Sequence, residues 1–199
     1  MKIAVIGAGK IGSTLGKKWA IAGHAIRFGV RNPSDQKYAD LHHIGDVQTI
    51  DEAINAADIV LVSLPGTAVM DFATEHGAAL AGKIVIDSTN NMRNPVMNNL
   101  ALLSNEAWGV HLVRAFNNLG WENFDNPTLE SIRIDLFYCC DLDSRPVAEQ
   151  LISEVGLRPV YTGDLSTAPI VDGLTRLWFA LAMGQGYGRR IAFKMLEEE

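Results

Sequence analysis

Short runs of consecutive apolar residues alternate along this chain with segments whose apolar residues recur at helical spacing. Strands that are buried on both faces of a parallel sheet have such uninterrupted apolar sequences. The runs are KIAVIG from residue 2, AIRFGV from 25, DIVLVSLP from 58, KIVIDSTNN from 83, HLVRAFNNLG from 111, IDLFYCC from 134 and RPVYTG from 158. Alternating strands and helices of this kind predict an α/β fold with a doubly wound, mostly parallel sheet.

Helix signals mark the segments between these runs. The segment after the first run places Leu15 and Trp19 on one helical face. Thr49 stands three residues before Glu52, which is the spacing of a capping box that begins a helix. The last part of the chain, APIVDGLTRLWFALAMGQGYGRRIAFKMLEEE, also predicts a helix and ends in an acidic tail. We therefore expect a helical C-terminal segment over residues 164–199.

The first apolar run leads directly into the glycine-rich segment GAGKIG, residues 7–12, and then into a helix pattern. Gly7 permits a tight turn, Gly9 lets a pyrophosphate approach the backbone, and Gly12 lets the helix pack closely on the strand. Free amide groups at the N-terminus of that helix then face the phosphates. Placed between strand and helix, these glycines predict a dinucleotide-binding, Rossmann-type fold rather than an unliganded turn.

The end of the second run distinguishes NADP from NAD. Proteins that bind NAD place Asp or Glu there, on the ribose 2′-hydroxyl. Here the run ends GVRNP, with Arg31 in that place and the first carboxylate only at Asp35. A guanidinium can bind a 2′-phosphate through two hydrogen bonds, whereas a carboxylate would repel it. The sequence therefore predicts NADP(H), and a solvated surface arginine is the alternative interpretation.

Three further loops follow the carboxyl ends of predicted strands, where ligands bind in open α/β sheets. Their sequences are SLPG at 63–66, STNN at 88–91 and AFNN at 115–118. Amide side chains both donate and accept hydrogen bonds, so Asn90, Asn91 and Asn117 suit a ribose or a carboxamide. The ordinary polarity of loops is the alternative explanation for these asparagines.

Composition and charge narrow the range of partners. A chain of 199 residues with 48% hydrophobic and 20% charged residues suits one soluble globular domain, alone or with a small appendage. A formal net charge of −6 gives no basic surface for nucleic acid or an anionic membrane. Adjacent Cys139 and Cys140 do not form a disulfide framework and suit a reducing compartment. With no signal peptide or membrane-spanning stretch expected, we predict a cytoplasmic protein.

No catalytic acid, catalytic base or metal site is predicted. The five histidines have no spaced carboxylate or cysteine partners of the kind that bind zinc. His111 begins a strand, at the end away from the ligand-binding edge, so we expect it to be structural.

The motifs VIGAGKIGSTLG, RFGVRNP, ADIVLVSLP, VIDSTNN, VRAFN and GLRPVYTGDL resemble, in order and spacing, those of NADPH-dependent reductases of the deazaflavin coenzyme F420. They are also similar to the cytosolic oxidoreductase domain of six-transmembrane metalloreductases, with DSTNN and RAFNN closer to the latter. The C-terminal LTRLWFALAMGQGYGRRIAFKML resembles the tail of free-standing deazaflavin enzymes. The resemblance implies direct hydride transfer from NADPH to a tricyclic acceptor in an adjoining pocket.

The resemblance also implies which residues form the site. The pyrophosphate would be held by Gly9, Lys10, Ile11 and Gly12, the 2′-phosphate by Val30, Arg31 and Asn32, and the ribose and nicotinamide by Leu64, Pro65, Asn90, Asn91 and Ala115. We therefore expect an NADPH-dependent oxidoreductase that acts on a small-molecule, flavin-like acceptor, either deazaflavin F420 or flavin. A non-catalytic NADP(H)-binding module that senses redox state is the alternative.

Two parts of the chain have separate expected roles. Residues 1–163 form the NADP-binding domain, and residues 164–199 complete the acceptor pocket, where the glycines of MGQGYG allow close backbone approach. One helical stripe of the C-terminal segment is apolar and contains Leu174, Leu177, Trp178 and Leu181. Together with the family resemblance, this stripe predicts a homodimer with the C-terminal segment at or near its interface.

Overall fold

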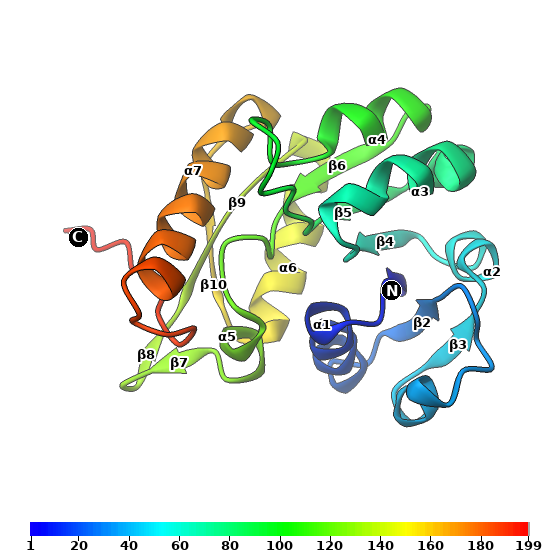
Figure 1. The fold of residues 1–199 in the computed structure, drawn as a ribbon, viewed down its shortest axis with the longest axis horizontal. Coiled ribbons are helices and arrows are strands. Elements are labelled where there is room, and N and C mark those ends of the chain that lie inside the picture. The colour runs from blue at the N-terminus through cyan, green and yellow to red at the C-terminus, as the bar shows by residue number, and fades with distance from the viewer. Residues whose placement is uncertain (199) are drawn as a thin grey trace.

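A central eight-stranded sheet organises residues 1–198, the part of the chain that the computed structural model describes (Figure 1). In spatial order its strands are β10 (Arg158–Tyr161), β9 (Asp135–Cys140), β6 (His111–Arg114), β5 (Ile84–Asp87), β4 (Ile59–Val62), β1 (Lys2–Ile6), β2 (Ala25–Gly29) and β3 (Asp46–Gln48). Neighbouring strands run parallel except β6 and β9, which are antiparallel. The predicted doubly wound, mostly parallel sheet is confirmed.

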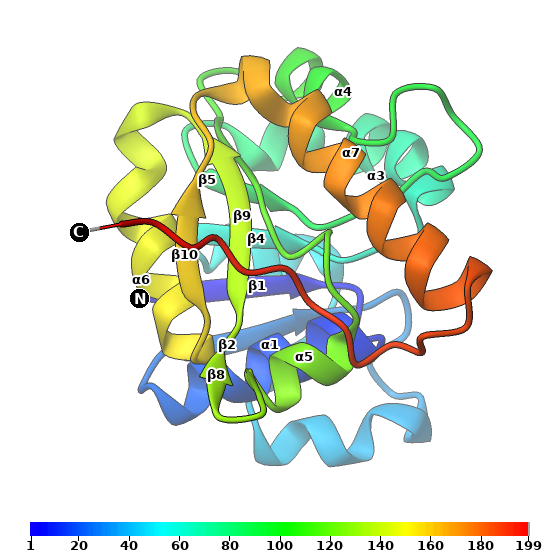
Figure 2. The same ribbon diagram turned by 90° about the vertical axis from the view of Figure 1, so that its left-hand side faces the viewer.

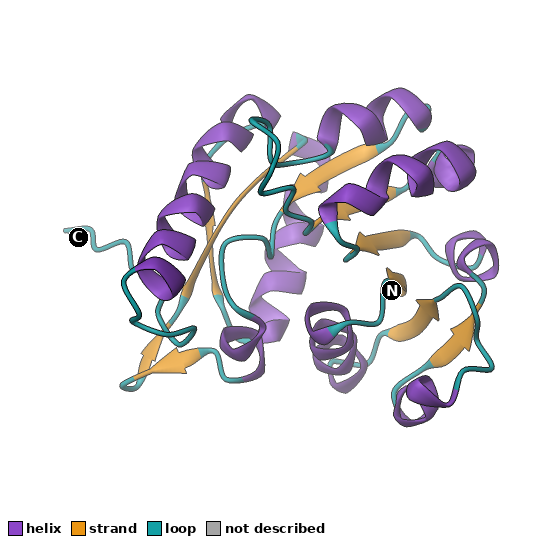
Figure 3. Ribbon diagram, viewed as in Figure 1, coloured by secondary structure: helices purple, strands orange, loops and turns teal. Residues whose placement is uncertain are grey.

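Helices cover both faces of this sheet (Figure 3). They are α1 (Lys10–Ile21), α2 (Ile50–Asn55), α3 (Val69–His76), α4 (Leu100–Glu106), α5 (Trp121–Asp125), α6 (Arg145–Val155) and α7 (Ala168–Phe179). One hydrophobic core joins the sheet to α1, α5 and α6, and a second joins it to α2, α3 and α4. Successive residues of β1 alternate between the two cores, with Val5 in the first and Ile6 in the second. None of the helices within residues 1–198 has the length and apolar character needed to cross a membrane.

The strand order places a topological switch between β1 and β4. After β1 the chain builds β2 and β3 on one side, and it then crosses to build β4, β5 and β6 on the other. In open α/β sheets, ligands bind beyond the carboxyl ends of the strands at such a point. The loops that follow β1 and β4 therefore lie where a ligand is expected.

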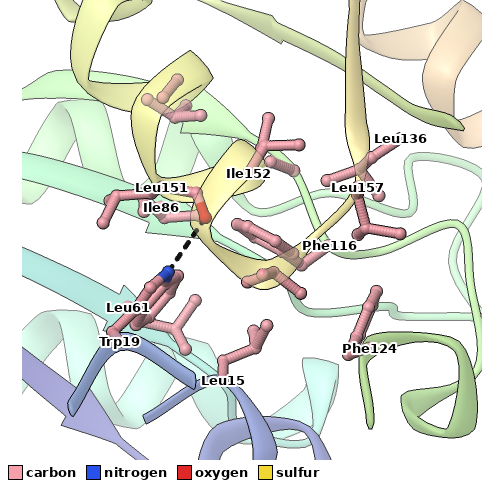
Figure 4. Close-up of a cluster of buried hydrophobic side chains, with 14 of the residues drawn as sticks. Leu15, Trp19, Leu61, Ile86, Phe116, Phe124, Leu136, Leu151, Ile152 and Leu157 are labelled. Carbon is pink, nitrogen blue, oxygen red and sulfur yellow. Dashed lines mark hydrogen bonds between the residues drawn. The ribbon is translucent and has the colours of Figure 1, made fainter. Parts of the chain in front are cut away.

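Trp19 fastens α1 to the other half of the molecule. Its indole N–H donates a 3.0 Å hydrogen bond to the Leu151 carbonyl of α6 (Figure 4). Its ring meets the edge of Phe116 at a centroid distance of 5.7 Å, and Phe116 meets Phe124 at 5.7 Å. Because edge-to-face aromatic pairs are directional, this cluster fixes α1, and with it the glycine loop, against α5 and α6.

Two local predictions are confirmed. The Thr49 hydroxyl accepts from the Glu52 amide, and the Glu52 carboxylate accepts from the Thr49 amide, as a capping box requires. Cys139 and Cys140 are both buried and free, and they belong to different cores on the two faces of the sheet. Burial raises the pKa of the Cys139 thiol to about 11 and that of the Cys140 thiol to about 12. Both therefore remain thiols at neutral pH.

The prediction that residues 164–199 are helical is wrong for the second half of that segment. Helix α7 ends at Phe179, a π-helical turn follows over Ala180–Gly184, and residues 185–198 contain no helix. Gly186 and Gly188 adopt left-handed φ values of 75° and 80°, so they turn the chain out of the helix. The segment then returns across β9 and β10 in extended form (Figure 2). Glu199 lies outside the described residues.

Candidate dinucleotide-binding site

Gly9 leaves open space at the start of α1, whereas the other two glycines of the loop fill structural positions. A Cβ atom on Gly7 would lie 2.4 Å from the Ser63 carbonyl oxygen, and one on Gly12 would lie 2.1 Å from the Gly7 oxygen. Among the described residues, 1–198, a Cβ atom on Gly9 would meet nothing within 4 Å. Gly9 is the N-cap of α1, and no side chain in that part of the chain caps the helix. The amides of its first turn can therefore bind a phosphate, as the sequence predicts.

Arg31 and Lys37 place two cations beside this loop. Arg31 follows the end of β2, and Lys37 stands on the 3₁₀ helix Gln36–His43. Both line a cleft of about 420 Å³ whose other walls are Gly7, Ala8, Gly29, Val30, Asn32, Tyr38, Ile50 and Leu64. The Lys37 ammonium lies 2.7 Å from the Asp35 carboxylate and 4.8 Å from the centre of the Tyr38 ring. Lys37 was not predicted from the sequence, because only its charge within a polar loop distinguishes it.

A second cavity of about 460 Å³ continues from the first, since Val30, Arg31, Ile50 and Leu64 line both. Helix α3 contributes Phe72 and His76 to its wall. The Nδ1 atom of His76 lies 2.6 Å from the Asp51 carboxylate, which joins α3 to α2 at the far end. Arg31 therefore stands where the two cavities meet, in a groove that runs from the glycine loop to α3.

The strand-end loops that the sequence singled out lie in one row. The Gly7 amide donates to the Gly29 carbonyl at 3.3 Å, so the glycine loop touches the end of β2. A Cβ atom on Gly66 would lie 2.5 Å from the Asn91 nitrogen, so the loops after β4 and β5 touch through their backbones. The Asn90 side-chain amide donates to the Asn117 carbonyl at 2.8 Å, which joins the loops after β5 and β6.

Two residues of the loop after β6 direct their side chains into the core, and Asn90 of the loop after β5 is already hydrogen-bonded. Ala115 is fully buried in the hydrophobic core, and Phe116 has a left-handed φ of 61° that directs its ring between Trp19 and Phe124. The Asn90 side chain is held by Arg114 as well as by the Asn117 carbonyl. These residues shape the loops, and the Asn90 side chain keeps one further N–H and one further oxygen lone pair for a ligand.

Arg114, a buried arginine beside the strand-end loops, was not predicted from the sequence. Its side chain is fully buried at the end of β6 and pairs with Asp87 and with Asp172 of α7. Arg114 and Asp172 are 58 residues apart, and no local pattern joins them. The only available signal was a charged residue within an apolar run, which requires a buried partner.

The doubly wound sheet and the position of the groove at its switch point are typical of dinucleotide-binding α/β proteins. Residues 2–91 match the family model described as NADP oxidoreductase, coenzyme F420-dependent, which confirms the resemblance noted in the sequence. Among curated proteins, mouse metalloreductase STEAP2 is 28% identical over 192 residues, with 92% of this chain and 37% of the relative covered. The chain spans 30% to 37% of the length of the curated relatives that it matches.

Solved structures share the fold. A candidate F420-dependent NADP reductase from Arthrobacter sp. FB24 superimposes with a TM-score of 0.85 and 21% identity, over 99% of this chain and 100% of that chain. The reductive aminase of Aspergillus terreus, solved in complex with NADPH and ethyl-5-oxohexanoate, has a TM-score of 0.71 and 19% identity. It is matched over 93% of this chain and 62% of that enzyme.

Proposed function

We propose that this protein is an NADPH-dependent oxidoreductase that transfers hydride between NADP(H) and a flavin-like acceptor, either deazaflavin F420 or flavin. The observation that carries the proposal is the pairing of an open, uncapped helix N-terminus at Gly9 with Arg31 at the end of β2. The first feature suits a pyrophosphate and the second suits a 2′-phosphate. The match of residues 2–91 to a family of NADP oxidoreductases supports the same choice.

The residues of the groove fit NADP(H) in order. The amides of Lys10 and Ile11 would hold the pyrophosphate, and Arg31 with Lys37 would hold the 2′-phosphate. The ring and ribose at the other end would lie along the loops after β4 and β5, against Leu64, Pro65 and Asn91. When bound, the reduced nicotinamide supplies the hydride. The protein contributes orientation and exclusion of water.

A flavin-like acceptor suits the side chains of this protein, because ring-to-ring hydride transfer needs no covalent nucleophile. Burial raises the pKa of both cysteine thiols, so neither supplies a thiolate at neutral pH. Two buried free cysteines also agree with a reducing compartment, and a cytoplasmic location is part of the proposal.

Anaerobic stopped-flow oxidation of NADPH, with deazaflavin or flavin added, tests the proposal. We expect label from C4-deuterated NADPH to appear at C5 of the deazaflavin. If NADPH binds tightly but neither acceptor is reduced, the reductase proposal fails. The non-catalytic NADP(H)-sensing module then becomes the better account.

A homodimer is the second part of the proposal. The outer face of α7 and the turn after it expose Ile170 at 66%, Leu177 at 47% and Met183 at 60% of their surface. Beside them lies an apolar hollow of about 330 Å³ lined by Phe137, Thr162, Ile170, Val171, Gly173, Leu174 and Leu177. A second copy of this chain would cover such a face. Trp178, which the sequence analysis placed in the same stripe, is only 2% exposed and packs inside the molecule.

A further inference from the structure

Arg114 lies at the centre of a buried polar network between the sheet and α7. Its guanidinium is fully buried, 2.7 Å from the Asp172 carboxylate and 3.2 Å from the Asp87 carboxylate. Both Nε and one terminal nitrogen of Arg114 donate to the same Asp172 oxygen, at 2.9 and 2.7 Å. This two-point contact fixes the plane of the guanidinium as well as its position.

The loop after β5 is wrapped around this guanidinium. Arg114 donates to the carbonyls of Asp87 and Thr89, at 3.1 and 2.5 Å, and to the Asn90 side-chain oxygen at 2.9 Å. Asp87 in turn accepts from the Thr89 amide and hydroxyl, at 2.9 and 2.6 Å. Three of the four residues from Asp87 to Asn90 are therefore held by Arg114 itself, so its position sets the path of the loop.

Helix α7 fastens the same network from the other side. The second Asp172 oxygen accepts from the Asn98 side chain at 2.7 Å. One turn later the Thr175 hydroxyl accepts from the Asn117 side chain at 2.9 Å. Asn117 lies in the loop after β6, and its backbone carbonyl accepts a hydrogen bond from the Asn90 side-chain amide. One face of α7 thus holds both strand-end loops on the side of the switch point away from Arg31.

Stability alone explains this arrangement poorly. Taking a guanidinium and two carboxylates out of water carries a large desolvation penalty, and apolar residues of equal volume often stabilise a core as well or better. A fully bonded buried pair does provide a fixed geometry. The groups fixed here are the loops assigned to the ribose and nicotinamide, whereas Gly9 and Arg31, at the adenosine end, make no hydrogen bond to Arg114 or Asp172 within residues 1–198.

We infer that Arg114 and Asp172 are a positioning pair for the nicotinamide end of the groove, through which α7 controls the loops that receive the reacting half of the cofactor. This inference rests on the proposed function. Neither residue needs to touch the cofactor, because each acts through Asn90, Asn117 and the backbone of the loop after β5. The adenosine end is held independently by the glycine loop and Arg31.

Calorimetry with two ligands separates the two ends. Adenosine 2′,5′-bisphosphate occupies only the adenosine end, whereas NADP⁺ occupies both. We expect Asp172→Asn to weaken NADP⁺ binding about tenfold or more, the effect of losing a charged hydrogen bond, and to leave the bisphosphate unchanged. Asp135→Asn is the control, because Asp135 is also a buried carboxylate paired with an arginine, Arg158, at the far edge of the sheet. It should change neither affinity.

Thr175→Val gives a milder test. It keeps the charges in place and removes only the hydroxyl that accepts the hydrogen bond from the Asn117 side chain. It should show the same selective loss, smaller than that of Asp172→Asn. Equal loss for both ligands, no loss for either, or unfolding of both variants would overturn the inference, because the pair would then be a requirement of the fold alone. If the unaltered protein binds neither ligand, the proposed function itself fails, and the inference fails with it.

Discussion

Arg31 and Lys37 differ in how much charge each can offer to a ligand. The Lys37 ammonium lies beside the Asp35 carboxylate, and the hydrogen bond between them lowers the pKa of Asp35. Arg31 forms no ion pair within residues 1–198, and it lines both cavities of the groove. A guanidinium without a competing carboxylate can direct its donors to a phosphate. Arg31 should therefore carry most of the preference for NADP over NAD.

Replacing Arg31 with alanine tests that preference. We expect Arg31→Ala to weaken NADPH binding by about 1.5 to 3 kcal/mol, the scale of a charge-assisted hydrogen bond, and to leave NADH binding nearly unchanged. Calorimetry with both cofactors measures the difference. Lys17→Ala, which removes an exposed cation from α1, should affect neither cofactor. Equal loss of both cofactors in Arg31→Ala would contradict the assignment.

Gly9 and Gly12 should respond to valine in opposite ways. Gly9 has extended backbone that any residue adopts, and its side-chain direction is open. Gly9→Val should therefore fold normally and lose both NADPH and NADH, because the side chain occupies the path of the pyrophosphate. Gly12→Val should lower the thermal midpoint, because its Cβ atom would collide with the Gly7 carbonyl. Thermal melts beside cofactor titrations separate the two; tight NADPH binding by folded Gly9→Val would reject the phosphate cradle.

The Thr49 capping box was predictable, because the two residues that form it stand within a few positions of each other. The roles assigned to the three glycines and to Arg31 rest on the same kind of local signal and stay predictions. Arg114 was not predictable, since its partners come from two distant segments, the end of β5 with its loop and helix α7, that only the folded sheet brings together. The burial of Ala115 was equally hidden, because a residue just past a strand can face the core or the groove.

At the scale of elements, the C-terminal segment shows where periodicity fails as a guide. Its apolar residues continue at helical spacing past Phe179, but three glycines within Gly184–Gly188 allow the chain to turn away. The residues beyond them then find distant partners. The Trp178 indole donates to the Ile191 carbonyl at 3.0 Å, and Arg189 lies 2.6 Å from Glu122 of α5. Such long-range bonds compete with helix formation, and the sequence does not display them.

Asp135 is the anchor of this segment, and its titration gives a pH prediction. Burial alone would raise its pKa, yet hydrogen bonds from Arg158 and Lys194 lower it below the ordinary value. A lowered pKa in the folded state means stabilisation that is present above the unfolded pKa, about 3.9, and is lost as pH falls through the lower folded value. Hydrogen exchange should show the Met195 amide, which donates to Asp135 at 2.8 Å, losing protection in that acid range.

Asp135→Asn should release the same amide already at neutral pH, because it removes the charge that accepts from Met195 and holds Lys194 at 2.7 Å. Asp143→Asn, at an exposed position on the surface, serves as its control. Unchanged exchange of the Met195 amide in Asp135→Asn would show that the anchor lies elsewhere.

At the scale of the whole molecule, the sequence predicted the sheet but not the direction of every strand. Uninterrupted apolar runs gave the fold class, since only a sheet covered on both faces needs them. The antiparallel pairing of β9 with β6 could not be predicted, because an apolar run has the same pattern in either direction. The very short strand β3 and the hairpin of β7 (Thr128–Leu129) with β8 (Ile132–Arg133) were also missed.

Self-association can be tested on the exposed face of α7. We expect a dimer in sedimentation experiments at micromolar concentration, and a shift towards monomer in Leu177→Glu, because a carboxylate would be buried against the partner. Met70→Glu alters a residue of α3 that is 64% exposed and should leave the assembly intact, because α3 is a separate helix that lies apart from α7 (Figure 1). A monomer in the unaltered protein would reject the dimer.

The position of Asp172 in the chain has a consequence for biosynthesis. A ribosome makes Arg114 first, and 58 further residues must follow before its partner on α7 exists. Until then the guanidinium remains hydrated. Asp87 alone does not offset the cost of removing it from water, and the two hydrogen bonds to Asp172 that orient it are still missing. A nascent chain can complete its glycine loop and β2 early, yet the second half of the groove must wait for α7. Under the proposed function, translation that stops short of α7 should therefore yield a chain that binds the adenosine half of the cofactor but lacks the loop geometry for the nicotinamide half.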